Sequence, residues 1–468
     1  MPPFVNGPAR AHAHGVGVIW WPELDVLCRP GEGLVHVIEA EPETFWLPRE
    51  DAPGRFTSPL SGMVGHLPQP KLLHGVGAPF GGSVPQPAGH REALASDIAA
   101  LQPDWISDHL SFNQFRRFDA DFEKPVNTGF LLPPAQCADG VAVAVEQIRR
   151  RSAMAGLPVA FEVPVSYLPR RPGEMEDGTF ANAVATTADC GILLDLHNLI
   201  CNERNGRQSV AAFCASIPLD RVWEIHLAGG QEAAGLWMDA HCGLVEPALM
   251  DLLEEIVPRL PALRAIIFEI MPDYIVSVGL PPIAAMLGRL NDIWTRRRPL
   301  VAAPVSRWTP ASINSIEPAP VTAPVLPQVN SAEAISAQVT SAVWESAIGA
   351  AVVGIPRPEL RAPLADWLGD AEHRLSIYRN YSQENRASNF VETTPRTIRH
   401  LLRNLGEAKT RAFLGRFYAA ATPTFAASDD ARAFLDFVSA AGVALNGLDD
   451  CITSDRALLA AGTTAISI

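Results

Sequence analysis

Ten side chains of the kinds that bind metal ions lie between positions 74 and 269 of this 468-residue sequence. All ten offer oxygen or nitrogen atoms, and none of them is a thiolate. Such donors suit Fe(II), Mn, Mg or catalytic Zn, and they disfavour iron–sulfur clusters and structural zinc. The ten candidate metal ligands are His74, His109, Glu162, Asp195, His197, Asn198, His226, Asp239, His241 and Glu269.

The number of candidates predicts more than one ion. Because one ion takes about four to six ligands, ten candidates indicate roughly two or three ions, with some side chains supporting the ligands instead of binding the metal. A single His or Glu at a strand end is more often a satisfied buried side chain than a ligand. The set as a whole favours a metal centre, because burying several uncompensated carboxylates and imidazoles would cost on the order of several kcal/mol each.

Two pairs of candidates share a local face. Asp195 and His197 are two residues apart on an expected strand, so their side chains point the same way, and Asp239 and His241 do so if the chain there is extended. His197 is either a ligand or a hydrogen-bond partner. We assign catalytic roles to Glu162, His197 and Asp239.

Four other acids lie close to these candidates. Asp108 precedes His109, and a salt bridge or a helix cap is its expected role, so we place Asp108 and Glu224 outside the site. Glu39 and Glu43 end another apolar run, where they act as ligand, base or rim residues.

The elements that must position these residues are short apolar runs alternating with helix-like stretches. The expected strands are 15–19, 35–41, 72–77, 105–111, 159–163, 192–198, 223–229 and 265–270. The expected helices between and after them are 90–102, 141–155, 179–188, 210–216, 247–257 and 275–297. This alternation predicts a TIM-like (β/α)8 barrel, in which the C-terminal strand ends converge on one face. An open doubly wound sheet is less favoured because GVGVIWWPE lacks a glycine-rich phosphate loop.

Composition changes sharply after the last of these runs. Residues 298–330 are rich in proline and predict a semi-extended linker, whereas 331–468 show the spacing of several short helices. We therefore expect a barrel domain at 1–297, a linker at 298–330 and a small all-α domain at 331–468. Residues 371–420 hold nine Arg or Lys against four Glu, which indicates either solvated helix faces with ion pairs or a docking surface for an acidic segment.

Composition also excludes several classes of function. The hydrophobic fraction is 48%, and the net charge of −14 argues against general affinity for nucleic acid or anionic lipid. The sequence lacks an apolar run of about 18 residues and an N-terminal secretory core, so we expect a cytoplasmic protein without a membrane partner. Seven cysteines without a C-x-x-C pair indicate free thiols.

Seven ordered motifs of the barrel region resemble a known family. They are LHGVG, SDHLS, a strand-ending Glu followed by PVSYL, LLDLHN, EIHLAG, DAH and FE. This succession, over roughly residues 12–290, resembles the DUF692 family of multinuclear non-heme iron-dependent oxidases. The resemblance implies a barrel with about two or three irons that uses dioxygen to oxidise cysteine or another residue of a ribosomally made precursor peptide.

The resemblance also implies which residues hold the metal. The family's ligand positions fall on His74, His109, Glu162, Asp195, His226, Asp239, His241 and Glu269. Three places depart from common family patterns: Val163 where relatives often read LEN, Leu196 and His197 where many read DVNN, and Gly230 where many read HLAGH. His197 replaces a weak oxygen donor with a stronger nitrogen donor.

The C-terminal region carries a second resemblance. The segment HRLSIYRNYSQENRASNF is similar to DUF2063-type partner proteins, which implies a module that recruits the precursor peptide. Fusion would raise the local peptide concentration to about the millimolar range. Our interpretation is an iron-dependent oxidase acting on a Cys-containing peptide. A divalent-metal barrel isomerase or phosphodiesterase and a non-catalytic peptide-binding module are the alternatives, and a homo-oligomer stays open.

Overall fold

The computed structural model describes residues 13–29, 31–117, 125–297, 339–356, 360, 362 and 364–460. These residues form two compact units, here called the barrel unit (Met1–Ser111 and Pro133–Gln328) and the helical unit (Phe112–Leu132 and Val329–Ile468). The predicted linker at 298–330 lies outside the described residues. Among the helices that are described, none has the length and the apolar run needed to cross a bilayer.

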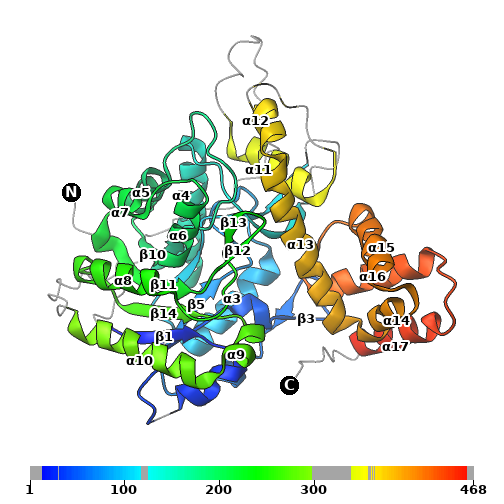
Figure 1. Cartoon of the computed structure of the whole chain (residues 1–468), viewed down its shortest axis with the longest axis horizontal. Helices are drawn as coiled ribbons and strands as arrows, with labels where there is room; N and C mark the ends of the chain where they lie inside the picture. Colours follow the sequence, from blue (N-terminus) through cyan, green and yellow to red (C-terminus); the bar gives the residue numbers. More distant parts are fainter. Residues whose placement is uncertain are drawn as a thin grey trace. The chain divides into compact units, whose positions relative to one another are not determined.

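Eight parallel strands close into the predicted barrel (Figure 1). In order around the barrel they are β1 (Gly15–Ile19), β14 (Ala265–Glu269), β11 (Val222–Ala228), β10 (Gly191–Asp195), β9 (Val159–Glu162), β6 (Ile106–His109), β5 (Lys71–Gly75) and β2 (Val37–Ala40). Each strand falls within or next to one of the predicted runs, because buried strands on both faces read as short continuous apolar segments. The predicted fold class is therefore confirmed.

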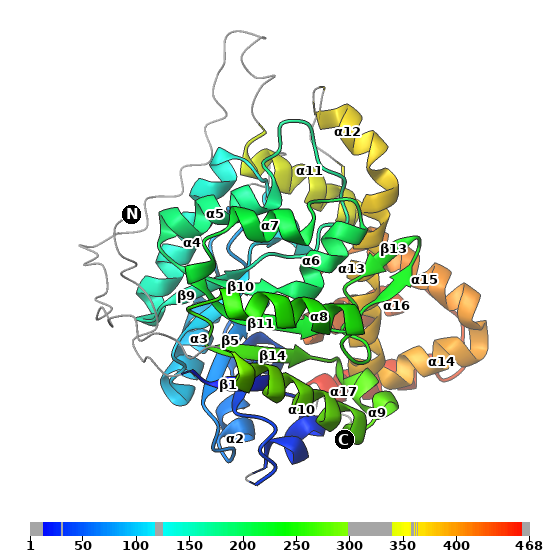
Figure 2. The ribbon, with the colours of Figure 1, turned by 60° about the vertical axis from the view of Figure 1, so that its left-hand side comes forward.

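Helices follow most of the strands and lie outside them (Figure 2). The barrel helices are η1 (Pro22–Cys28), α1 (Pro42–Phe45), α2 (Leu60–Val64), α3 (Ala88–Leu101), α4 (Ala138–Ala155), α5 (Asp177–Ala188), α6 (Leu196–Arg204), α7 (Val210–Ser216), η2 (Leu219–Arg221), α8 (Pro247–Ile256), η3 (Val257–Arg259), α9 (Pro272–Val278) and α10 (Leu280–Arg296). Two short hairpins complete the unit: β3 (Leu47–Pro48) with β4 (Phe56–Thr57), and β12 (Gln231–Ala233) with β13 (Leu236–Met238).

The single helix predicted at 275–297 is wrong. The structure has two helices, α9 and α10, separated by Gly279 at φ 82°. This left-handed conformation suits glycine, and Pro281 and Pro282 follow Leu280 in the first turn of α10, where a missing N–H is harmless.

Apolar side chains fill the interior of the barrel away from the C-terminal ends of its strands. One buried cluster contains Ile19, Val37, Leu72, Trp105, Ala160, Leu193, Trp223, Ala265 and Ile267. Gly191 makes room for this packing, because a Cβ there would lie 2.3 Å from the Trp223 ring. The filled interior leaves the C-terminal strand ends as the face on which polar side chains can meet.

The helical unit combines a hairpin from the first half of the chain with the C-terminal helices. Its elements are β7 (Phe112–Phe115), β8 (Val126–Leu132), α11 (Ser341–Val353), α12 (Leu364–Asp370), α13 (Glu372–Thr393), α14 (Pro395–Leu405), α15 (Glu407–Ala420), α16 (Ala427–Ala440) and α17 (Leu448–Ala460). Ser382 Oγ donates to the Thr128 carbonyl at 2.7 Å, and the Phe130 and Tyr381 rings stack with centroids 4.7 Å apart. The sequence pattern gave no sign of this insertion.

A buried ion pair joins two helices of this unit. Arg386 on α13 donates through Nε and Nη2 to the two carboxylate oxygens of Asp430 on α16, both at 2.8 Å. Both side chains are almost fully buried, and the guanidinium lies 4.7 Å from the centre of the Phe417 ring. The bidentate geometry offsets the cost of removing both charges from water.

Candidate metal centre

Five buried candidates come from five different strands of the barrel. His74 lies on β5 and His226 on β11, while Glu162, Asp195 and Glu269 are the last residues of β9, β10 and β14. All five side chains are almost fully buried. The strands hold them at one end of the barrel, so residues distant in sequence meet there.

Glu162 lies at the centre of the first group of contacts. Its Oε2 is 3.2 Å from His74 Nε2, 3.6 Å from His109 Nε2 and 3.8 Å from His226 Nδ1. His74, Glu162 and His226 each offer a donor atom within 4.8 Å of the other two, which is close enough to share one ion. Three imidazoles around one carboxylate oxygen form the kind of donor set that divalent transition metals prefer.

Glu269 links a second group. One of its oxygens contacts His226 Nδ1, and the other lies 3.1 Å from His241 Nδ1. His241 Nε2 in turn lies 2.8 Å from Asp239 Oδ1. Asp195, His226 and Glu269 also each offer a donor atom within 4.8 Å of the other two, so the acids and imidazoles at this end of the barrel form one continuous cluster.

Asp239 and His241 point together, although not for the predicted reason. They follow β13, and His241 has φ 46°, which is a left-handed and not an extended conformation. Their contact therefore comes from a turn of the chain and not from strand alternation.

The placement of His197 on a strand is wrong. β10 ends at Asp195, and α6 begins at Leu196, because the Asp195 side chain caps the helix by accepting from the backbone N–H of Asn198 at 2.7 Å. His197 Nε2 lies 3.4 Å from Cys201 Sγ and 3.6 Å from Asp239 Oδ1. His197 thus reaches the edge of the cluster from the first turn of a helix.

Asn198 reaches the centre of the cluster from the same turn. Its Nδ2 donates to Glu162 Oε1 at 2.6 Å. This bond fixes one oxygen of Glu162 and leaves the other, Oε2, facing the histidines.

Two acids that the sequence reasoning left outside or undecided also lie here. Glu39 Oε2 is 2.7 Å from His226 Nε2, and Glu224 Oε1 is 3.9 Å from the same nitrogen. Glu224 could have been found, because it precedes His226 by two residues on one strand and therefore shares its face. Asp108, by contrast, pairs with Arg151 at 3.3 Å, as expected.

The protonation of the cluster reflects its burial and its density of charge. Burial raises the pKa of the Glu162 carboxyl to about 8, against the lowering effect of His109. Burial and then the Glu269 charge raise the pKa of Asp195 to about 7. Burial alone would lower the pKa of the His109 imidazole, but the Glu162 carboxylate raises it to about 10. Protons therefore occupy positions that a divalent cation would take over on binding.

Two buried oxygen atoms without hydrogen-bond partners bear on whether a metal ion fits this cluster. Asp195 Oδ2 and Asn198 Oδ1 are buried and have no hydrogen-bond partner among the described residues. Buried oxygens are normally paired, and a cation in the cluster would supply the missing partner. Together with the donor types, these atoms show that the residues present fit a metal centre.

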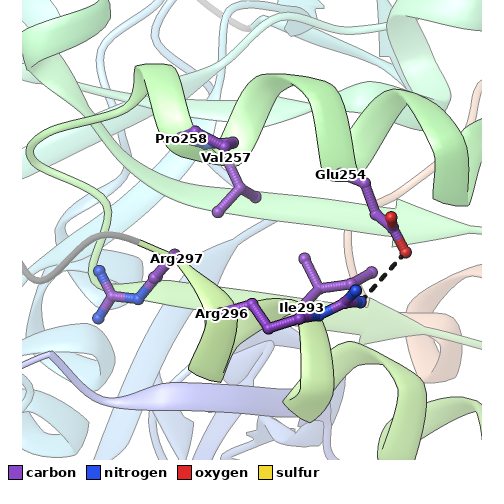
Figure 3. Close-up of a pocket in the computed structure, with 6 residues that line it drawn as sticks. All are labelled: Glu254, Val257, Pro258, Ile293, Arg296 and Arg297. Carbon is purple, nitrogen blue, oxygen red and sulfur yellow. Dashed lines mark hydrogen bonds and ion pairs between the residues drawn. The ribbon is translucent and has the colours of Figure 1, made fainter.

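A pocket elsewhere on the barrel unit is separate from this cluster. It lies between α8, η3 and α10 and is lined by Glu254, Val257, Pro258, Ile293, Arg296 and Arg297 (Figure 3). None of these residues is a candidate ligand, and Arg296 pairs with Glu254 at 3.4 Å. We assign no function to it.

Gly230 makes room for His197, which gives a first prediction. A Cβ at position 230 would lie 2.5 Å from His197 Cε1 and 2.6 Å from Trp237 Nε1. We expect Gly230→Ala to displace the His197 ring and to cost about 1–3 kcal/mol of stability, as overpacking does. Denaturant unfolding should show a lower midpoint, whereas the control Gly288→Ala, in open space on α10, should leave it unchanged or raise it. Equal midpoints for the two variants would contradict the packing argument.

The fold and the site together define a class of protein. It is a closed β/α barrel in which buried imidazoles and carboxylates at one end form a candidate multinuclear metal centre. Sequence comparison gives the family: the model described as "RiPP precursor modification enzyme MbnB/TglH/ChrH" matches residues 30–275. The chain belongs to this family, whose members modify precursors of ribosomally synthesised and post-translationally modified peptides. The resemblance to the DUF692 family is thereby confirmed.

Individual proteins are similar to parts of this chain. UPF0276 protein Anae109_1558 of Anaeromyxobacter sp. is 31% identical over 199 residues, covering 42% of this chain and 67% of that protein. A UPF0276 protein of Neisseria meningitidis serogroup C is 32% identical over 232 residues, covering 48% and 78%. Among solved structures, D-allulose 3-epimerase from Methylomonas sp. aligns with 12% identity and a TM-score of 0.39, covering 63% of this chain and 100% of that chain.

Proposed function

We propose that this chain is a multinuclear iron-dependent oxidase that uses dioxygen to modify a cysteine, or another residue, of a ribosomally synthesised precursor peptide. The observation that carries the proposal is the convergence of imidazoles and carboxylates from five barrel strands around Glu162 and His226. Membership of a peptide-modifying family supports the peptide as substrate. The oxygen and nitrogen donors support iron.

The residues proposed to hold about two or three irons are His74, His109, Glu162, Asp195, His226, Asp239, His241 and Glu269, with His197 and Asn198 beside them. Bound iron would supply one-electron redox chemistry toward dioxygen and a site for the substrate thiolate.

The chain's own residues position these donors. Asn198 holds Glu162 Oε1, so that Oε2 stays directed at His74 and His109. His197 and His241 approach the same Asp239 oxygen and hold that carboxylate at the edge of the cluster. In this proposal, Glu162, His197 and Asp239 are the residues that act in catalysis.

We propose that the helical unit recruits the precursor peptide. This extends the resemblance of HRLSIYRNYSQENRASNF, which forms most of α13, to DUF2063-type partners. A tethered module would make peptide docking effectively intramolecular.

The test uses the full chain purified without oxygen and loaded with Fe(II). We expect roughly two or three tightly bound irons per chain, together with an oxygen-dependent mass change of a Cys-containing peptide encoded beside the gene. The same peptide with Cys→Ser is the matched control. A peptide that binds but keeps its mass under oxygen would favour a non-catalytic module. Turnover of sugars or phosphodiesters with Mg or Mn and no oxygen consumption would favour the isomerase or phosphodiesterase class.

A further inference from the structure

We propose that Glu39 is a positioning residue that selects which nitrogen of His226, and through Ser107 which nitrogen of His74, is free to bind metal. The inference rests on the proposed metal centre and assigns a role to a residue outside the candidate ligand set. Glu39 lies on β2 and is fully buried. It faces His226 from the opposite side to Glu162 and Glu269.

The contact with His226 is the first step. Glu39 Oε2 lies 2.7 Å from His226 Nε2, which is an ion-pair distance between two fully buried side chains. A histidine that binds metal through one nitrogen commonly donates its other N–H to a carboxylate, which fixes the tautomer and the ring orientation. Nδ1, which faces Glu162 and Glu269, is therefore the nitrogen left for metal.

Ser107 extends the same control to His74. Its hydroxyl donates to Glu39 Oε1 at 3.5 Å, and its oxygen lies 2.9 Å from His74 Nδ1. We assign the one hydroxyl proton to the contact with Glu39, so that the Ser107 oxygen accepts from His74 Nδ1–H. His74 Nε2 then carries the lone pair, and it lies 3.2 Å from Glu162 Oε2. One carboxylate thus orients two imidazoles toward the same oxygen of Glu162.

This arrangement also bears on the number of ions. Each of the three groups of possible ligands among the described residues contains His226, and one of them is Glu39, Glu224 and His226. With Nε2 engaged by Glu39, that group supports the ring instead of holding an ion. Glu224 adds nothing to its orientation, because its Oε1 is 3.9 Å from Nε2 and its Oε2 accepts from Trp105 Nε1 at 2.9 Å.

The test measures iron release, with Fe(II) alone as the probe and the full chain as the protein. Glu39→Met keeps the side-chain length and removes the acceptor, so we expect a chelator to extract iron about 10–100-fold faster than from the wild type. Glu39→Gln keeps an acceptor oxygen and should restore release to within about threefold of the wild type, since one neutral hydrogen bond replaces a charged one. Asp97→Asn is the control for a buried acid outside the cluster, where Asp97 accepts from Trp46 Nε1 at 2.8 Å, and it should release iron at the wild-type rate.

A spectroscopic readout separates positioning from general loosening. The Mössbauer spectrum of bound 57Fe should change in Glu39→Met and return toward that of the wild type in Glu39→Gln. Ser107→Ala should increase the release rate while leaving the His226 contact in place, which covers the case in which Glu39→Met does not fold.

The outcomes are distinguishable. Loss of one whole ion in Glu39→Met, with normal release of the rest, would make Glu39 a ligand and overturn the positioning role. Wild-type release rates and spectra in Glu39→Met and Ser107→Ala, or equal effects of Glu39→Met and Asp97→Asn, would overturn it as well. A wild-type protein that binds no Fe(II) would overturn the proposed function itself.

Discussion

Replacing His226 with alanine is expected to lower the proposed iron-dependent peptide oxidation by about 10³-fold, or about 4 kcal/mol of transition-state stabilisation. His226 belongs to each of the three possible ligand groups among the described residues, and no other residue does. Its loss would also leave Glu39 and Glu269 facing each other without the imidazole that separates them. Iron analysis and mass spectrometry of the peptide product measure the two effects.

The matched control is His66→Ala. His66 is a half-exposed histidine that pairs with Asp25 at 3.0 Å, outside the cluster. It should keep full iron content and full activity, because a surface ion pair contributes little. A His226→Ala protein with wild-type iron content and product yield would argue against a metal centre at this end of the barrel.

The largest expected effect on stability lies in the helical unit. Arg386→Met should cost about 3–5 kcal/mol, because it leaves Asp430 buried without its cation. The same change removes the bond from Arg386 Nη1 to the Ala421 carbonyl. Hydrogen exchange of the α13 and α16 amides is the appropriate measurement, since a two-unit chain need not unfold in one step.

Two further variants sharpen this prediction. Arg411→Ala removes an exposed pair with Glu407 on α15, and it should leave the exchange of those amides unchanged. Adding Asp430→Leu to Arg386→Met should recover part of the loss, since no unpaired charge then remains. Equal protection in Arg386→Met and the wild type would show that the buried pair contributes nothing.

The barrel could be predicted because its signal is local. Each buried strand reads as a short apolar run with polar residues at its end, as AIIFE does in β14, and closure follows from the number of runs. The predictions failed at the junctions between strands and helices or between two helices, where a single residue decides the backbone conformation. Asp195 accepts from Asn198 and starts α6, and Gly279 at φ 82° ends α9, although apolar periodicity continues through both places.

The candidate site could be predicted as far as residue type alone identifies possible metal ligands. The ten candidates are residue types that bind metal, and the structure brings donor atoms of Glu162, His74 and His226 close together. Glu39 stayed undecided because an acid at a strand end is equally a ligand, a base or a rim residue until its neighbour is known. Only the contact between Glu39 and His226, on strands distant in sequence, distinguishes these cases.

The β7–β8 hairpin has a consequence for how the polypeptide is made. Phe115 is fully buried and packs with Ala350 and Val353, which leave the ribosome more than two hundred residues later. During synthesis the hairpin is therefore exposed, without the helix that covers Phe115, until the C-terminal part of the chain has been made. A protein truncated after the proline-rich segment would leave these apolar side chains permanently exposed. We therefore expect it to aggregate even if its barrel folds correctly.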